Sequence, residues 1–83
     1  MEDKEVTLSK MPVSQAGEVI KILGSQRLCL KLSMLGIFKG VKFKKKNQQV
    51  MRGPIIVEVG KSQVAIGFGM ASKIIVKAEK EKQ

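Results

Sequence analysis

The stretch that decides the fold is PIIVEVGKSQVAI, residues 54–66. Two alternating, mostly β-branched runs flank the dipeptide Gly60-Lys61, and a two-residue connection that contains glycine is typical of an antiparallel hairpin. Pro54 stands at the start of the first run, where its missing N–H costs least. The letters GKS also end a phosphate-binding loop, but that motif needs a glycine where this chain has Ile55. We therefore predict strand, turn and strand.

Three further strands are expected around this hairpin. Residues 16–23 are rich in β-branched side chains and end at Gly24. Residues 40–44 alternate with a period of two, which places Val41 and Phe43 on the inner face and the lysines between and after them on the wet face. Residues 67–72 break the alternation and predict one helical turn, after which residues 73–77 form the last strand.

One segment has helical rather than strand character. Ser25 is a candidate N-cap, and residues 26–35 consist mainly of good helix formers. Leu28, Leu32 and Leu35 recur on one helical face, so we predict that this stripe is buried. Gly36 follows directly, where a left-handed C-terminal residue is expected.

These elements predict a mainly β fold with one short helix. About five short strands in so small a domain suggest a closed barrel, because closure removes the exposed sheet edges that invite aggregation. We divide the chain into a flexible N-terminal segment over residues 1–10, a folded domain over residues 11–77 and a charged C-terminal tail over residues 78–83.

The chain is small and strongly basic, with 83 residues and a formal net charge of +9. Such a charge attracts nucleic acid, anionic lipid or an acidic protein face. We expect much of it to serve solubility, with residues 44–46 at the exposed tip of a hairpin. No apolar run reaches the roughly 20 residues of a membrane span, and the first ten residues do not form a signal peptide, so we expect a cytoplasmic protein without membrane insertion.

The side chains that usually carry catalysis are scarce. The chain contains no histidine, only Cys29 as a thiol, and few carboxylates outside the terminal segments. These residues cannot build a histidine-based catalytic set or a zinc site, and they do not supply enough oxygen ligands for an iron site. We therefore predict no enzymatic activity, no metal site and no cofactor, and we interpret Cys29 as structural.

Nucleic-acid binding is the main alternative that the charge leaves open. Lys42 and residues 44–46 could contact phosphates without sequence specificity. Small basic barrels usually add surface aromatic side chains that stack on bases, but this chain has no Trp or Tyr, and Phe43 falls on the predicted inner face. The composition therefore makes nucleic acid an unfavoured partner.

Several motifs in order along the chain resemble the ferrous iron transport protein A (FeoA) family. The string from Leu32 to Gly40, LSMLGIFKG, is similar to the helix exit of that family and is followed by an alternating strand. One position departs from the family pattern, because Met34 stands two residues before the glycine, where the family usually carries an acidic side chain. The further matching segments are GEVIKI at residues 17–22, PIIVEV at 54–59, VAI at 64–66, Ala71, and IIV at 74–76.

The resemblance spans residues 11–77 and implies a fold and a role. The implied fold is a small SH3-like β-barrel of about five strands. The implied role is that of a cytosolic accessory of ferrous iron uptake, which docks on the cytosolic GTP-binding part of the membrane transporter FeoB and modulates it. The same domain type forms the C-terminal part of iron-dependent repressors, so a generic protein-interaction adaptor is a second interpretation, beside a basic barrel that binds nucleic acid.

We predict a partner-binding surface at the end of the helix and the loop after it. Its residues are Met34, Leu35, Gly36, Ile37, Phe38 and Lys39, together with the basic side chains Arg27 and Lys31. Met34 and Phe38 are the candidates for exposed apolar anchors, because interfaces favour such residues. The alternative for Phe38 is that it closes the end of the barrel. A weak homo-oligomer is also compatible with the sequence.

Overall fold

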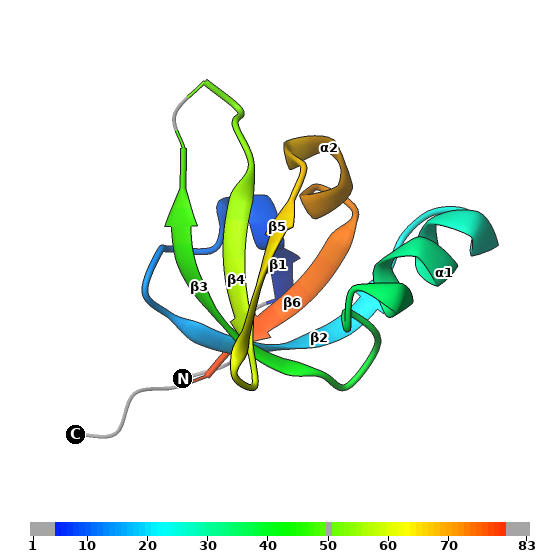
Figure 1. Cartoon of the computed structure of the whole chain (residues 1–83), viewed down its shortest axis with the longest axis horizontal. Helices are drawn as coiled ribbons and strands as arrows, with labels where there is room; N and C mark the ends of the chain where they lie inside the picture. Colours follow the sequence, from blue (N-terminus) through cyan, green and yellow to red (C-terminus); the bar gives the residue numbers. More distant parts are fainter. Residues whose placement is uncertain (1–4, 50, 80–83) are drawn as a thin grey trace.

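A computed structural model describes residues 5–49 and 51–79 of the chain. Figure 1 shows a strongly curved sheet with α1 projecting from one side and α2 covering one end. In chain order the elements are β1 (Glu5–Thr7), the 3-10 turn η1 (Leu8–Lys10), β2 (Ala16–Ile22), α1 (Gln26–Met34), β3 (Lys42–Gln48), β4 (Ile55–Val59), β5 (Ser62–Ile66), α2 (Phe68–Ala71) and β6 (Ile74–Ala78).

The six strands form one antiparallel sheet in the order β1-β6-β2-β3-β4-β5. Register shifts interrupt the β2–β6 ladder near Ile20 and the β3–β4 ladder near Lys46. Such bulges bend a strand and increase its twist, and here they accompany the curling of the sheet around a single core. The buried apolar residues of this core come from strands, helices and loops: Leu8, Met11, Val19, Leu32, Ile37, Phe43, Ile55, Val57, Ile66, Ala71, Ile74 and Val76.

The central hairpin is confirmed. Val59 lies opposite Ser62, and the turn between them consists of Gly60 and Lys61. Gly60 has a φ of 62°, which suits the first central residue of a type II′ turn and which glycine adopts without steric cost. The helical turn at residues 68–71 and the inward direction of Phe43 are confirmed as well.

The N-terminal boundary of the domain differs from the prediction. Residues 5–7 pair with β6, and η1 follows them at once. Leu8 and Met11 are both buried in the core. The expectation of a flexible segment over residues 1–10 therefore fails for residues 5–10, while residues 1–4 lie outside the described part. At the other end, Ala78 belongs to β6, so the strand extends into the segment predicted as a tail, of which residues 80–83 also lie outside.

The barrel is not closed by hydrogen bonds in the described residues. β1 and β5 are the two outer strands of the sheet, and no ladder joins them. The sheet has six strands rather than about five, because β1 was not expected. An antiparallel six-stranded sheet that curls around one core, with a helical turn before its last strand, is an SH3-like fold.

The basic triplet at residues 44–46 is not the exposed tip of a hairpin. It lies within β3, which continues to Gln48. Lys45 has 0% of its surface exposed, while its two neighbours point into solvent. The Nζ of Lys45 donates hydrogen bonds to the carbonyl oxygens of Leu8 at 2.9 Å and Met11 at 2.6 Å. The period-two alternation of β3 therefore extends one step further than predicted and carries a lysine into the core.

Candidate partner-binding surface

Helix α1 starts where the sequence predicts. The Oγ of Ser25 accepts a hydrogen bond from the backbone N–H of Leu28 at 3.2 Å, which satisfies one of the free donors at the helix start. Of the predicted buried stripe, Leu32 is buried, Leu28 is half-buried, and Leu35 is exposed. The helix is therefore attached to the core by a narrow strip of its surface, which leaves most of its circumference in solvent.

The C-terminal end of α1 has the hydrogen bonds of a Schellman motif. Ile37 N–H donates to the Leu32 carbonyl at 2.9 Å, and Gly36 N–H donates to the Ser33 carbonyl at 3.0 Å. Gly36 has a φ of 89°, the left-handed conformation that this motif requires. The motif turns the chain so that Ile37 enters the core beside Leu32, with 2% of its surface exposed.

The loop after this motif is held by backbone hydrogen bonds. Val41 N–H donates to the Phe38 carbonyl at 3.0 Å and closes a tight turn, in which Gly40 has a φ of 93°. Val19 of β2 then fixes the loop from both sides, because its carbonyl accepts from Gly40 at 2.8 Å and its N–H donates to the Val41 carbonyl at 2.9 Å. Phe38 is therefore presented on a rigid loop and keeps 51% of its surface exposed.

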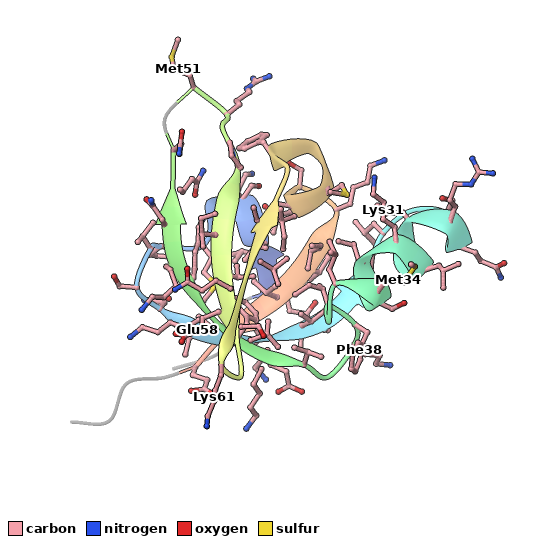
Figure 2. The ribbon with its side chains drawn as sticks, in the orientation of Figure 1. Lys31, Met34, Phe38, Met51, Glu58 and Lys61 are labelled. Carbon is pink, nitrogen blue, oxygen red and sulfur yellow. The ribbon has the colours of Figure 1, made fainter. Side chains whose placement is uncertain are left out.

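The outward side of α1 carries an apolar surface. Met34 is 78% exposed and Leu30 is 63% exposed, and the two are four residues apart on one helical face. Because successive residues advance by about 100°, this face is opposite to buried Leu32. Figure 2 shows Met34 and Phe38 at the same end of the molecule, distant from Met51. We call Leu30, Met34, Leu35 and Phe38 the α1 patch.

Basic side chains accompany the α1 patch. Arg27 and Lys31 are exposed on α1, and Lys39 is exposed directly after Phe38. On the helix, Arg27 and Lys31 flank the line of Leu30 and Met34 on one side, as their spacing requires. The sequence from residue 19 to residue 57 contains nine basic residues and no acidic one. The α1 patch therefore lies in a basic part of the sequence.

The structure divides the predicted surface residues into two groups. Ile37 is buried and cannot contact a partner in this conformation, so the prediction fails there, and half-buried Gly36 serves the helix end. Phe38 does not close the end of the barrel. Leu30 was missed, although its spacing to Met34 would have revealed it. The exposed members of the predicted set are Met34, Leu35, Phe38, Lys39, Arg27 and Lys31.

Over residues 5–49 and 51–79, no three Cys, Asp or Glu side chains gather into a group that could hold a metal ion. Cys29 is a free thiol and is half-buried on α1. In the same ranges, no helix has the length and apolar character that crossing a membrane requires.

Solved structures of known proteins share the fold of this chain. A crystal structure of an iron uptake regulatory protein, FeoA, is 33% identical, covers 92% of this chain and 99% of its own, and has a TM-score of 0.82. A FeoA-like protein from Clostridium acetobutylicum is 19% identical over 100% of this chain and 95% of its own, with a TM-score of 0.82. A search of curated proteins gave no match.

The same fold occurs within larger regulators. A manganese-dependent transcriptional repressor is 18% identical to this chain, with a TM-score of 0.83. The match covers 95% of this chain but only 44% of the repressor chain. At such identities the likeness shows the fold alone. The fold places this protein in the class of small SH3-like domains, and the α1 patch is an exposed apolar surface on that domain. A model of the FeoA domain matches residues 6–78, and the chain belongs to the FeoA domain family.

Proposed function

We propose that this chain is a non-enzymatic accessory of ferrous iron uptake. In this proposal it docks on the cytosolic GTP-binding part of a FeoB-type membrane transporter, in the cytoplasm, and modulates the activity of that transporter. Membership of the FeoA domain family supports the association with iron transport. The observation that carries the docking step is the α1 patch, an exposed apolar surface on a rigid support.

Two properties suit the α1 patch to a protein partner. Large exposed apolar side chains that gather on one surface of a small domain often mark an interaction site. Met and Phe are enriched in interface cores, whereas Arg27, Lys31 and Lys39 would form a charged rim. Rim charges mainly accelerate association with an acidic surface and contribute less to affinity. We therefore assign Met34 and Phe38 the role of anchors and the basic residues the role of steering.

The structure offers a well-matched pair of variants for testing the surface. Met34→Ser replaces a proposed anchor that is 78% exposed. Met51→Ser makes the same chemical change at a position that is 91% exposed, at the tip of the β3–β4 hairpin and distant from α1 in Figure 2. Binding of the full chain to the isolated cytosolic part of the cognate transporter is titrated calorimetrically. We expect Met34→Ser to weaken binding about tenfold or more, as a change at an interface anchor does, and Met51→Ser to leave it unchanged.

The same titration separates the alternative functions. Random RNA and DNA are titrated in parallel at two salt concentrations. Binding to the transporter that persists at about 150 mM salt supports the accessory role, and the rate of GTP hydrolysis with and without the chain then gives the sign of the modulation. Failure to bind the transporter, together with tight nucleic-acid binding that weakens steeply with salt, would contradict the proposal.

The β3 surface argues against nucleic acid as the partner. Lys45 is buried and cannot reach a phosphate. Glu18 lies opposite Lys42 in the β2–β3 ladder, and Glu58 lies opposite Lys44 in the β3–β4 ladder. The carboxylate of Glu58 also approaches Lys46 at 3.7 Å. Carboxylates thus alternate with the exposed lysines of β3 and reduce the potential that a phosphate backbone would feel.

A further inference from the structure

Strand β5 has an unused edge. It is an outer strand of the sheet, and in the described residues it pairs only with β4. The two-residue turn makes Val59 and Ser62 a hydrogen-bonded pair, and such pairs alternate along an antiparallel ladder. Ser62, Val64 and Ile66 therefore bond to β4. The backbone N–H and C=O groups of Gln63 and Ala65 point to the opposite edge.

No backbone partner occupies that edge within residues 5–49 and 51–79. Neither Gln63 nor Ala65 takes part in a backbone hydrogen bond outside the sheet ladders, and both residues are exposed. Four strong hydrogen-bonding groups are thus presented in a straight row. Such a row is a template for another strand.

The usual protection of an edge strand is missing from β5. Natural proteins place charges, proline or a bulge on such edges, or keep them very short. β1, the other outer strand, has only three residues and carries Glu5. β5 has the sequence SQVAI, without charge or proline, and its ladder with β4 runs without a register shift. In a chain with a net charge of +9, this uncharged edge is an exception.

We propose that the free edge of β5 pairs with β5 of a second copy of this chain, antiparallel about a two-fold axis at Val64. In this register Gln63 lies opposite Ala65 of the other copy, and Ala65 lies opposite its Gln63. Each pair exchanges two N–H to C=O hydrogen bonds, because the free groups occur at alternate residues. The two sheets become one continuous sheet with four intermolecular backbone hydrogen bonds.

The charges at the ends of β5 are compatible with this arrangement. Lys61, which extends from the β4–β5 turn in Figure 2, would lie opposite Gly67 of the other copy, an exposed residue without a side chain. The two Lys61 residues are then separated by six residue steps, about 20 Å along the strand, which exceeds the screening length of about 8 Å at physiological salt. The remaining opposition is the overall repulsion of two basic domains. Self-association should therefore strengthen as salt is raised.

The first experiment measures self-association of the full chain by sedimentation velocity between about 10 µM and about 1 mM, since an interface of one short strand is weak. We expect a monomer–dimer equilibrium that shifts toward the dimer at higher salt. Ala65→Pro should raise the dissociation constant at least about tenfold, because proline removes an N–H that β4 does not use and is tolerated at such edges. Ala65→Ser is the matched control and should dimerise as the wild type does.

Two results would overturn the proposal. The first is that the wild-type chain stays monomeric up to about 1 mM at high salt. The second is that Ala65→Pro dimerises with the same dissociation constant as the wild type. Should Ala65→Pro lose its fold by circular dichroism, Ala65→Lys replaces it, because an edge charge blocks strand addition without touching the β4 ladder.

A cross-linking experiment tests the register itself. In a Cys29→Ser background, Val64→Cys places two cysteines opposite each other across the two-fold axis, in a pair close enough for a disulfide. Mild oxidation should yield a covalent dimer on a non-reducing gel. Ser62→Cys in the same background is more exposed but lies opposite Ile66 of the other copy, so it should remain monomeric. Cross-linking of Ser62→Cys without that of Val64→Cys would overturn the register.

Discussion

The Nζ of Lys45 donates a hydrogen bond of 2.6 Å to the backbone carbonyl of Met11, in the interior of the protein. The same ammonium donates to the Leu8 carbonyl at 2.9 Å and approaches the Ser9 carbonyl at 3.5 Å. Three carbonyls at the end of η1 thus surround one cation, much as basic side chains satisfy the last carbonyls of a helix. Lys45 thereby ties the N-terminal segment to β3 across the core.

We predict that Lys45→Met destabilises the protein. Methionine fills a similar volume without a charge, but it leaves the Met11 carbonyl without the donor it has now, while the Leu8 carbonyl keeps the backbone N–H of Met11 at 3.3 Å. Each unsatisfied buried group costs about 1–3 kcal/mol, partly offset because the buried charge is removed. The expected net loss is about 2 kcal/mol in the free energy of unfolding, measured by urea denaturation.

The neighbouring lysine supplies the control for this prediction. Lys44 is exposed on the same strand, so Lys44→Met should change the free energy of unfolding by less than about 0.5 kcal/mol. Hydrogen exchange adds a local measurement: Lys45→Met should accelerate exchange of the β1 amides at residues 5–7 more than that of β4. Equal effects of the two substitutions would show that Lys45 does not hold the N-terminal segment.

Stability should depend on pH through the same side chain. Burial lowers the pKa of the Lys45 ammonium from its ordinary value of 10.5, because desolvation disfavours the charged form. Between the lowered pKa and 10.5, the unfolded chain binds a proton that the native protein has lost. Unfolding then takes up a proton, so the free energy of unfolding rises with pH in this window, and below the window Lys45 contributes nothing to its pH dependence.

The measurement for this effect is a series of urea denaturations from neutral pH to about pH 10.5, on the wild type and on Lys45→Met. The other lysines contribute to both proteins, so the difference between the two isolates Lys45. We expect the wild type to gain stability relative to the variant as the pH rises toward 10.5. A difference that stays constant or shrinks would mean that burial does not perturb this ammonium.

Local signals predicted the elements that depend on neighbouring residues. Gly60-Lys61 between two β-branched runs specified the hairpin, and Ser25 and Gly36 marked the two ends of the helix. β1 escaped prediction because its partner is β6, some 70 residues later, and because its short sequence mixes charge with apolar residues. Lys45 escaped because the strand was expected to end at residue 44, and only a longer strand gives Lys45 the inward direction of Val41 and Phe43. Its burial depends on carbonyls that the fold brings from the N-terminal segment.

The partner-binding surface was also predicted only in part, because local signals fix some of its residues and the three-dimensional course of the chain fixes the others. Helical spacing and the glycine after the helix were enough to predict an exposed Met34. The inward turn of Ile37 depends on the Schellman motif, which reverses the chain direction and selects the residue that follows Gly36 for the core. Leu30 was left out because a leucine in a helix is usually assigned to the buried side, whereas here Leu32 already occupies that side.

Two leucines on α1 should therefore respond differently to the same substitution. Leu32→Ala removes a fully buried side chain and should lower the free energy of unfolding by about 2–5 kcal/mol. Leu30→Ala removes a mostly exposed one and should change it by less than about 0.5 kcal/mol while weakening the proposed partner binding. Urea denaturation and the binding titration together test this. Destabilisation by Leu30→Ala comparable to that of Leu32→Ala would place Leu30 in the core and remove it from the α1 patch.

The helix end that presents the α1 patch can be tested at Gly36. A Cβ at this position would meet nothing within 4 Å, so a substitution acts through the backbone conformation alone. At a φ of 89°, alanine should cost about 1–2 kcal/mol, the penalty of a left-handed conformation for a residue with a Cβ. Gly36→Asn should cost less, because asparagine tolerates this region better. If the two variants are equally stable, the Schellman geometry does not control this helix end, and the rigid presentation of Phe38 must come from the hydrogen bonds of Val19.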